Sequence, residues 1–122
     1  MKDSPLLEKS LDFALSIVRS AQHLQASREY VLSKQILRSA TSIGALLREA
    51  EFAASHADYI NKFTVAVKEA NETEYWLLLL YRGGYLKEDV FNSLHFTCLE
   101  LVKMLVSSIN TLKQRTSGKK KG

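Results

Sequence analysis

Few side chains in this sequence are of the types that carry out catalysis or bind metals. It has three histidines and one cysteine, and no histidine has an acid three positions before it. The Glu-x-x-His motif that builds di-iron sites in helix bundles is therefore missing. The sequence also has no His-x-x-x-His pair, no Cys-x-x-Cys pair and no glycine-rich phosphate loop. These absences predict a protein that is not an enzyme and that needs no metal and no cofactor.

Three nearby acids and the cysteine favour structural roles over acid–base or nucleophilic chemistry. Glu69, Glu72 and Glu74 lie within six residues, but helical spacing places them on different faces. Lys68 lies four residues before Glu72, which predicts an ordinary ion pair along one helix. Cys98 falls on an apolar stripe, so we expect a small core residue there.

A basic stripe is the most distinctive predicted surface. Its members follow a 4-3-4-3-4 spacing, which places them on one face of a helix. They are Lys34, Arg38, Thr41, Ala45, Arg48 and Phe52. The three cations could contact successive phosphates, and an exposed Phe52 could stack on an unpaired base. The alternative is a solvated helix face, whose positive field Glu49 and Glu51 weaken.

The last ten residues hold the excess of positive charge. They include Lys113, Arg115, Lys119, Lys120 and Lys121 and no acid. The other residues hold 12 basic and 13 acidic side chains, so the net charge of +4 is a property of this end. We predict that residues 113–122 form a disordered tail, which either aids solubility or serves as a short phosphate-binding arm.

Four helical segments must position these side chains. Apolar residues recur with helical spacing over about 6–24, 29–54, 57–82 and 88–112, and no segment alternates with a period of two. Ser4 and Pro5 suit the start of the first helix, Ser55 and Asp58 form a capping box before the third, and Gly83-Gly84 ends it. Short connections make successive helices antiparallel. Residues 1–112 are therefore predicted to form a single all-α domain, an up-down-up-down four-helix bundle.

Two of these helices carry more apolar surface than one bundle can bury. The first has two neighbouring apolar rows that cover roughly 200°, whereas a docked helix needs ~100° or somewhat more. The end of the third is apolar on every side. We therefore expect a homo-oligomer. The candidate interface residues are Phe13, Ile17, Leu24, Trp76, Leu79 and Leu80.

The sequence points to the cytoplasm. Its N-terminus has no apolar segment of the kind found in signal peptides. The longest unbroken apolar run, residues 75–81, is far shorter than the ~20 residues of a membrane span. A lone cysteine suits a reducing compartment. No contact with a membrane is expected.

Several segments together resemble one bacterial protein family. They are Gln35–Gly44, Arg48–Glu51, Asp58–Ile60, Lys68–Leu77 and Glu100–Leu105. The pattern Lys-Glu-x-x-Glu-Thr-x-Tyr-Trp-Leu over residues 68–77 is the most specific part. Over about residues 8–113 the chain resembles the four-helix-bundle proteins of the 23S rRNA intervening-sequence family. It departs from the pattern at Leu46, where the family commonly has Asn.

The resemblance implies a homopentameric ring without catalytic residues. The family takes its name from reading frames in inserts within bacterial 23S rRNA genes. A structurally related protein, the accessory variability determinant of diversity-generating retroelements, is a basic pentamer that binds a reverse transcriptase and nucleic acid. By this analogy the expected partner is RNA or a ribonucleoprotein. The alternative is a scaffold that holds a partner protein, such as an enzyme.

Overall fold

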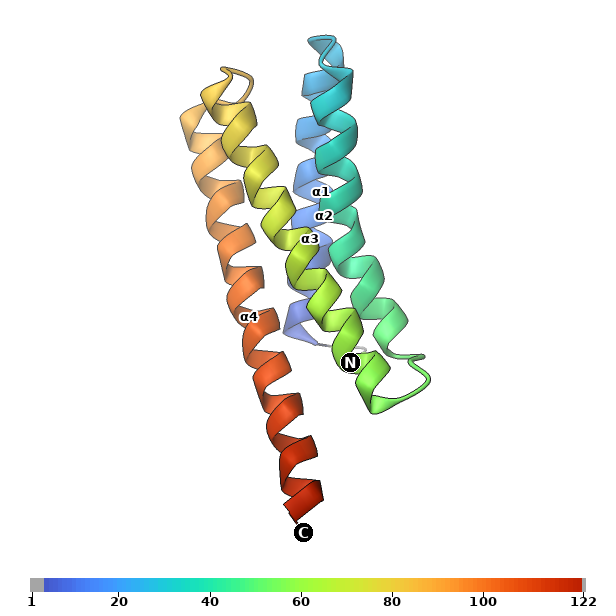
Figure 1. Cartoon of the computed structure of the whole chain (residues 1–122). Coiled ribbons are helices and arrows are strands. Elements are labelled where there is room, and N and C mark those ends of the chain that lie inside the picture. Colours follow the sequence, from blue (N-terminus) through green and yellow to red (C-terminus); the bar gives the residue numbers. More distant parts are fainter. Residues whose placement is uncertain (1–3, 122) are drawn as a thin grey trace.

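The chain folds into four helices and no strands over the residues described. The computed structural model describes the backbone of residues 4–121 and the side chains of residues 4–115 (Figure 1). The helices are α1 (Pro5–Ala26), α2 (Tyr30–Ala50), α3 (His56–Arg82) and α4 (Glu88–Lys121). Each helix runs antiparallel to the one before it, and α4 returns to contact α1 (Figure 1). The predicted all-α, four-helix architecture is confirmed.

Local capping fixes where the helices begin. The Ser4 hydroxyl accepts hydrogen bonds from the backbone N–H groups of Leu6 (3.2 Å) and Leu7 (3.3 Å), with Pro5 in the first turn. The Ser55 hydroxyl accepts from the N–H of Asp58 at 3.1 Å and starts α3 in the same way. These bonds satisfy N–H groups that have no partner within the helix. Both predicted starts are therefore confirmed.

The α3–α4 connection depends on a glycine. After Gly83, Gly84 adopts a left-handed backbone with φ of 84°, a conformation that suits a residue without a Cβ atom. The N–H of Tyr85 then donates to the carbonyl of Leu80 at 2.9 Å, which closes the end of the helix. The chain is thereby reversed so that α4 lies along α3, as the predicted helix end at Gly83-Gly84 requires.

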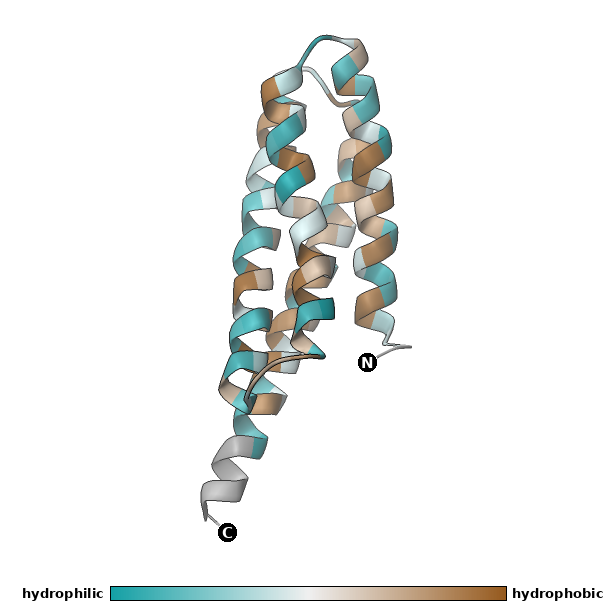
Figure 2. Cartoon of the chain, turned by 90° about the vertical axis from the view of Figure 1, so that its right-hand side faces the viewer, coloured by the Kyte–Doolittle hydropathy of each residue, from teal (hydrophilic) through white to brown (hydrophobic). Residues whose placement is uncertain are grey.

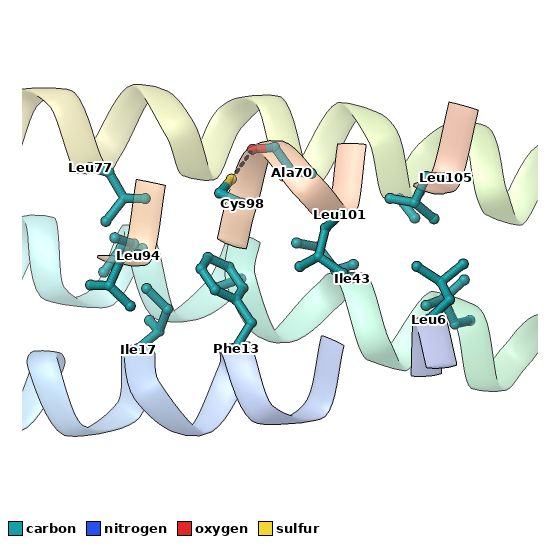
Figure 3. Close-up of a cluster of buried hydrophobic side chains, with 14 of the residues drawn as sticks. Leu6, Phe13, Ile17, Ile43, Ala70, Leu77, Leu94, Cys98, Leu101 and Leu105 are labelled. Carbon is teal, nitrogen blue, oxygen red and sulfur yellow. Dashed lines mark hydrogen bonds between the residues drawn. The ribbon is translucent and has the colours of Figure 1, made fainter. Parts of the chain in front are cut away.

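Each helix buries one row of side chains with spacings of three and four residues, the spacing of a helix–helix seam. The rows are Leu6, Ser10, Phe13, Ile17, Ala21 and Leu24 in α1; Ser33, Ile36, Ala40, Ile43, Leu47 and Ala50 in α2; Phe63, Ala66, Ala70, Thr73, Leu77 and Leu80 in α3; and Phe91, Leu94, Cys98, Leu101, Leu105 and Ile109 in α4. Figure 3 shows side chains from these rows pointing into one shared interior. Figure 2 shows this periodicity as apolar segments that recur between hydrophilic ones along each helix.

Small and polar residues let the helices approach closely. A Cβ atom added to Gly44 of α2 would lie 3.2 Å from the Ser10 hydroxyl of α1. Between α2 and α3, the buried hydroxyls of Ser39 and Thr73 lie 2.8 Å apart. The Cys98 thiol donates to the carbonyl of Ala70 at 3.3 Å and joins α4 to α3 (Figure 3). Every buried side-chain nitrogen and oxygen in the described part of the chain has a hydrogen-bond partner.

Two predictions about helix ends are wrong. Helix α2 stops at Ala50 rather than near residue 54, and tighter turns carry the chain to the cap at Ser55. Phe52 therefore lies in the α2–α3 connection and not on the outer face of α2. Helix α4 continues to Lys121, where a disordered tail after Leu112 was predicted. No proline or capping residue interrupts its backbone hydrogen bonds, and its end projects beyond the other helices (Figure 1).

Most of the predicted interface residues belong to the core instead. Phe13, Ile17, Leu24 and Leu80 are between 0% and 2% exposed in a single chain. The prediction is wrong for these four, because a side chain buried in its own bundle cannot contact a second copy. Leu80 belongs to the buried row of α3 and points inward.

Candidate nucleic-acid interface

The basic stripe is only partly assembled on α2. Lys34, Arg38, Thr41, Ala45 and Arg48 are exposed along its outer face, as the spacing predicts. Phe52, with 87% of its surface exposed, lies past the end of the helix. The aromatic ring and the cations are therefore carried by different elements, a connection and a helix.

Arg38 is committed to the neighbouring helix. Its Nη1 atom lies 3.1 Å from Glu69 Oε2, and its Nη2 atom lies 2.5 Å from Glu72 Oε1. The hydrogen bond that Arg38 donates to Glu72, followed by the charges of both acids, raises the pKa of Arg38. The same hydrogen bond lowers the pKa of Glu72. Two carboxylates of α3 thus surround the central cation of the stripe and reduce its attraction for phosphate.

The contacts of Glu72 differ from those predicted. Its Oε1 atom also accepts a hydrogen bond from the indole N–H of Trp76 at 3.3 Å. The predicted ion pair between Lys68 and Glu72 is wrong, since Glu72 pairs with Arg38 and no pair with Lys68 forms within residues 4–115. A partner on α2 outcompetes the residue four positions away on the same helix.

Two cations of the stripe stay unpaired. Within the described side chains, neither Lys34 nor Arg48 has a carboxylate within ion-pair distance. Glu49, which was expected to weaken the stripe, lies 3.5 Å from Lys62 of α3 instead. The effective positive charge of the outer face of α2 is therefore carried by Lys34 and Arg48.

The end of α4 is a second basic region, and it has no acids. After Glu100 the sequence contains no Asp or Glu, while Lys113 and Arg115 are exposed. Lys119, Lys120 and Lys121 continue the same helix, and their side chains lie outside the described residues. Among the described side chains, neither Lys113 nor Arg115 has a carboxylate within ion-pair distance, and the helix continues beyond the ends of the other helices (Figure 1). We call residues 113–121 the α4 basic end.

A histidine–glutamate pair joins α3 to α4 and was missed from the sequence. Glu74 Oε2 lies 2.8 Å from His95 Nε2. The His95 ring stacks on Phe91 with centroids 5.0 Å apart, and Phe91 stacks on Tyr81 at 4.4 Å. Glu74 and His95 lie at equal sequence distances from the Gly84–Tyr85 turn. In an antiparallel helical hairpin such residues lie at the same height, so this spacing could have predicted the pair. The pair explains the acid within the apolar arc of α3.

The candidate interface between copies changes accordingly. Of the residues predicted for it, Leu79 is 40% exposed and Trp76 is half-buried. The large apolar side chains exposed on the other helices were not predicted for this role. They include Leu11, Leu15 and Val18 on α1 and Phe96, Leu99 and Val106 on α4.

The described residues offer no group of three or more His, Cys, Asp or Glu side chains that could hold a metal ion. Cys98 is buried, as predicted, and desolvation, followed by the charge of Glu74, raises its pKa to about 12. In the described part of the chain, no helix combines the length and apolar character that crossing a bilayer requires.

Comparison with known proteins gives a consistent result. The family model of the 23S rRNA-intervening sequence protein matches residues 2–107. A crystal structure of a protein with unknown function from the S23 ribosomal protein family of Bacteroides thetaiotaomicron is 51% identical, with a TM-score of 0.83. That match covers 85% of this chain and 97% of the other. No curated protein matches significantly. The range matched by the family model ends before Lys113, so the α4 basic end lies outside it.

Proposed function

Because the chain belongs to the 23S rRNA-intervening sequence protein family, we propose that it is a non-catalytic cytoplasmic protein that binds RNA as a homo-oligomer. The observation that carries the proposal is the α4 basic end. It presents Lys113 and Arg115, followed by three lysines, on a helix that projects from the bundle and has no acid after Glu100 (Figure 1). Such an arrangement suits the phosphate backbone, which supplies most of the affinity in non-specific binding.

The outer face of α2 adds less to this proposed interface. Lys34 and Arg48 have no carboxylate partner among the described residues, whereas Arg38 is held between Glu69 and Glu72. We propose that Lys34 makes a secondary phosphate contact, and that Arg48 makes one only where no second copy covers it. Phe52 can stack on an unpaired base, because its ring is almost fully exposed.

Self-association would multiply these weak contacts. The resemblance to the family implies five copies, and five basic ends on one particle raise the effective concentration of each contact. The apolar side chains left exposed on α1 and α4 support self-association. Light scattering at micromolar concentration tests this part: we expect about five times the chain mass of 13.8 kDa, and a monodisperse particle of 13.8 kDa would contradict it.

A salt titration tests the RNA part. Full-length protein, freed of nucleic acid by a high-salt wash, is added to a fluorescent single-stranded RNA of about 20 nucleotides. We expect the affinity to fall linearly on a log–log plot, with a slope of roughly −0.7 for each phosphate contacted. Absence of saturable binding at 50 mM salt, or binding that does not respond to salt, would overturn the proposal.

Exposed Phe96 and Leu99 favour a second candidate function, a scaffold for a partner protein. Apolar patches on a soluble domain commonly mark protein-binding surfaces. A scaffold would retain a protein partner through a high-salt wash and would carry no nucleic acid. The ratio of absorbance at 260 and 280 nm before and after that wash distinguishes the two functions.

A further inference from the structure

A ring with an odd number of copies requires two different contact surfaces on each chain. A contact made by the same patch on both copies only builds pairs, whereas a head-to-tail contact can close a ring of any size. Resting on the proposed homo-oligomer, we infer that the outer row of α4 in one copy docks into a groove between α1 and α2 of the next copy. Both surfaces are present on this chain.

The outer row of α4 is an unpartnered helix face. It consists of Phe96, Leu99, Lys103 and Val106, whose spacing of three and four residues places them on one side of the helix. Phe96 is 65% exposed, and Leu99 and Val106 are 39% and 40% exposed. Lys103 has no ion-pair partner within residues 4–115. The row is thus an apolar ridge with one cation.

The α1–α2 groove provides a matching apolar depression. It is lined by Leu7, Glu8, Leu11 and Ala14 of α1 and by Thr41, Gly44, Ala45 and Arg48 of α2. Most of these side chains are apolar or small, and Leu11 is 53% exposed. The close approach of Gly44 to Ser10 forms the floor. A groove of small residues between two helices accepts a third helix, as in other helix-in-groove complexes.

The outer row of α4 and the α1–α2 groove lie at the same height along the bundle axis. Within one chain, Lys9 of α1 pairs with Glu100 of α4 at 3.1 Å, so these residues stand at the same height along the bundle. At 1.5 Å per residue in antiparallel helices, Phe96 stands level with residues 13–14 of α1 and Leu99 with residue 10. Rotation about an axis parallel to the helices keeps each residue at its level. Phe96 and Leu99 of one copy therefore face the groove of the next.

The charges favour the same orientation. At these levels Lys103 stands within about one helical turn of Glu8, and Glu88 within about one turn of Arg19. Glu8 lines the groove, so opposite charges meet at the Lys103 end of the contact, while Arg19 and Glu88 lie outside the groove lining and the outer row. Arg48, which also lines the groove, opposes Lys103, so we assign most of the association to the apolar side chains. The occupant that fits both the ridge and the charges is a second copy of this chain.

Two complementary variants test the contact. Phe96→Glu removes the ridge, and Ala45→Glu blocks the groove; both positions are exposed, so a single chain should still fold. Each variant alone should give the 13.8 kDa monomer by light scattering. Mixed in equal amounts at about 100 µM, they should form dimers, because each mixed pair keeps one intact contact. The control Val31→Glu, at a position 71% exposed and outside both surfaces, should assemble like the unmodified chain.

A charge exchange provides a second measurement. Glu8→Lys should weaken assembly several-fold, because Lys103 then faces two cations of the groove, and adding Lys103→Glu should restore it. If the unmodified chain assembles but Phe96→Glu and Ala45→Glu leave it intact, this inference fails and the proposed homo-oligomer stands. This inference also fails, and the homo-oligomer stands, if Leu79→Glu is the only variant that disperses the assembly. It fails likewise if the mixed variants stay monomeric although circular dichroism shows that they are folded. An unmodified chain that is monomeric at every concentration would overturn both.

Discussion

The outer face of α2 and the end of α4 carry the same types of cation in opposite surroundings. On α2, the guanidinium of Arg38 lies between Glu69 and Glu72 of the adjacent helix. On α4, Lys113 and Arg115 are exposed at the end of the bundle, and among the described side chains neither has a carboxylate within ion-pair distance. The sequence suggests two comparable basic regions, whereas in the structure the central cation of the α2 stripe is paired with two acids and the described cations of the α4 basic end are not. The electrostatic potential of a basic stripe therefore depends on the charged side chains that the adjacent helix places beside it.

This difference separates two uses of a positive side chain. A cation that is paired across two packed helices contributes to the arrangement of the bundle, although exposed pairs contribute little each. A cation without an acidic partner is available to neutralise a phosphate, and the release of counterions condensed on the nucleic acid then drives binding. The first use should be visible in thermal stability and the second in RNA affinity.

The largest expected effect is on the alkylation rate of Cys98, which lies in the core of the bundle that carries both basic regions. The pKa of Cys98 is raised from 9.0 to about 12, so its thiolate population at pH 8 is lower by a factor of about 1,000 than that of an ordinary thiol. Alkylation by iodoacetamide, followed by mass spectrometry, should be slower by about that factor in the native chain and should become fast in denaturant. Each surface variant must retain this protection. Rapid labelling of the native chain would show that the core opens.

Removal of the α4 cations should have the next largest effect. Changing Lys113, Arg115 and the three terminal lysines to Gln removes up to five phosphate contacts, and we expect RNA affinity at 50 mM salt to fall by about 100-fold or more. The double variant Lys34→Gln/Arg48→Gln should lose less than about 10-fold. Fluorescence anisotropy with one RNA measures both, with Lys68→Gln/Lys87→Gln as a charge-matched control. Equal losses of RNA affinity from the α2 and α4 variants would contradict the proposed difference between the two regions.

Freeing Arg38 should make α2 more like α4. In Glu69→Gln/Glu72→Gln, both carboxylates become neutral amides of the same shape, and RNA affinity should rise by a factor of about 3 to 10 as one cation becomes available. Adding Arg38→Gln should cancel the gain. If the gain in RNA affinity remains after this third change, Arg38 is not its source. The two acids would then act by lowering the electrostatic potential of the whole surface.

The smallest effect is a pH dependence of stability. The hydrogen bond from Arg38 lowers the pKa of Glu72 in the folded chain, so its stabilising contribution is present above the unfolded pKa of about 4.3 and is lost as the pH falls through the lowered folded value. Melting temperatures of the unmodified chain and of Arg38→Met should therefore differ slightly at pH 7 and converge toward pH 3. Because these side chains are exposed, salt should also narrow the gap. A difference that is constant with pH would contradict this origin.

Much of the fold was predictable because its determinants are local. Ser4, Ser55 and the Gly83-Gly84 pair act within one helical turn, so the sequence indicates three helix boundaries. The core was harder to predict. Two apolar rows lie side by side on α1, and the structure buries Ser10 while Leu11 stays exposed. Only the close approach of Gly44 explains that choice, and it is a contact between helices.

The candidate site was less predictable for the same reason. The spacing of Lys34, Arg38 and Arg48 correctly placed them on one exposed face, but pairing of Arg38 with α3 depends on how far α2 is shifted along its neighbour. The polar and basic composition after Leu112 predicted a disordered tail, whereas α4 continues to Lys121. Long-range alignment, more than residue type, decided the pairing of Arg38.

The buried hydroxyls of Ser39 and Thr73 have a consequence for folding specificity. In an apolar seam, sliding one helix by a single turn usually exchanges one leucine contact for another at little cost. Here such a slip would separate the two hydroxyls, which lie 2.8 Å apart, while each kept a carbonyl of its own helix within hydrogen-bond distance, Ile36 for Ser39 and Glu69 for Thr73. The loss is then one buried hydrogen bond between helices, about 0.5–1.5 kcal/mol. This pair therefore favours the observed alignment of α2 against α3 by a modest amount.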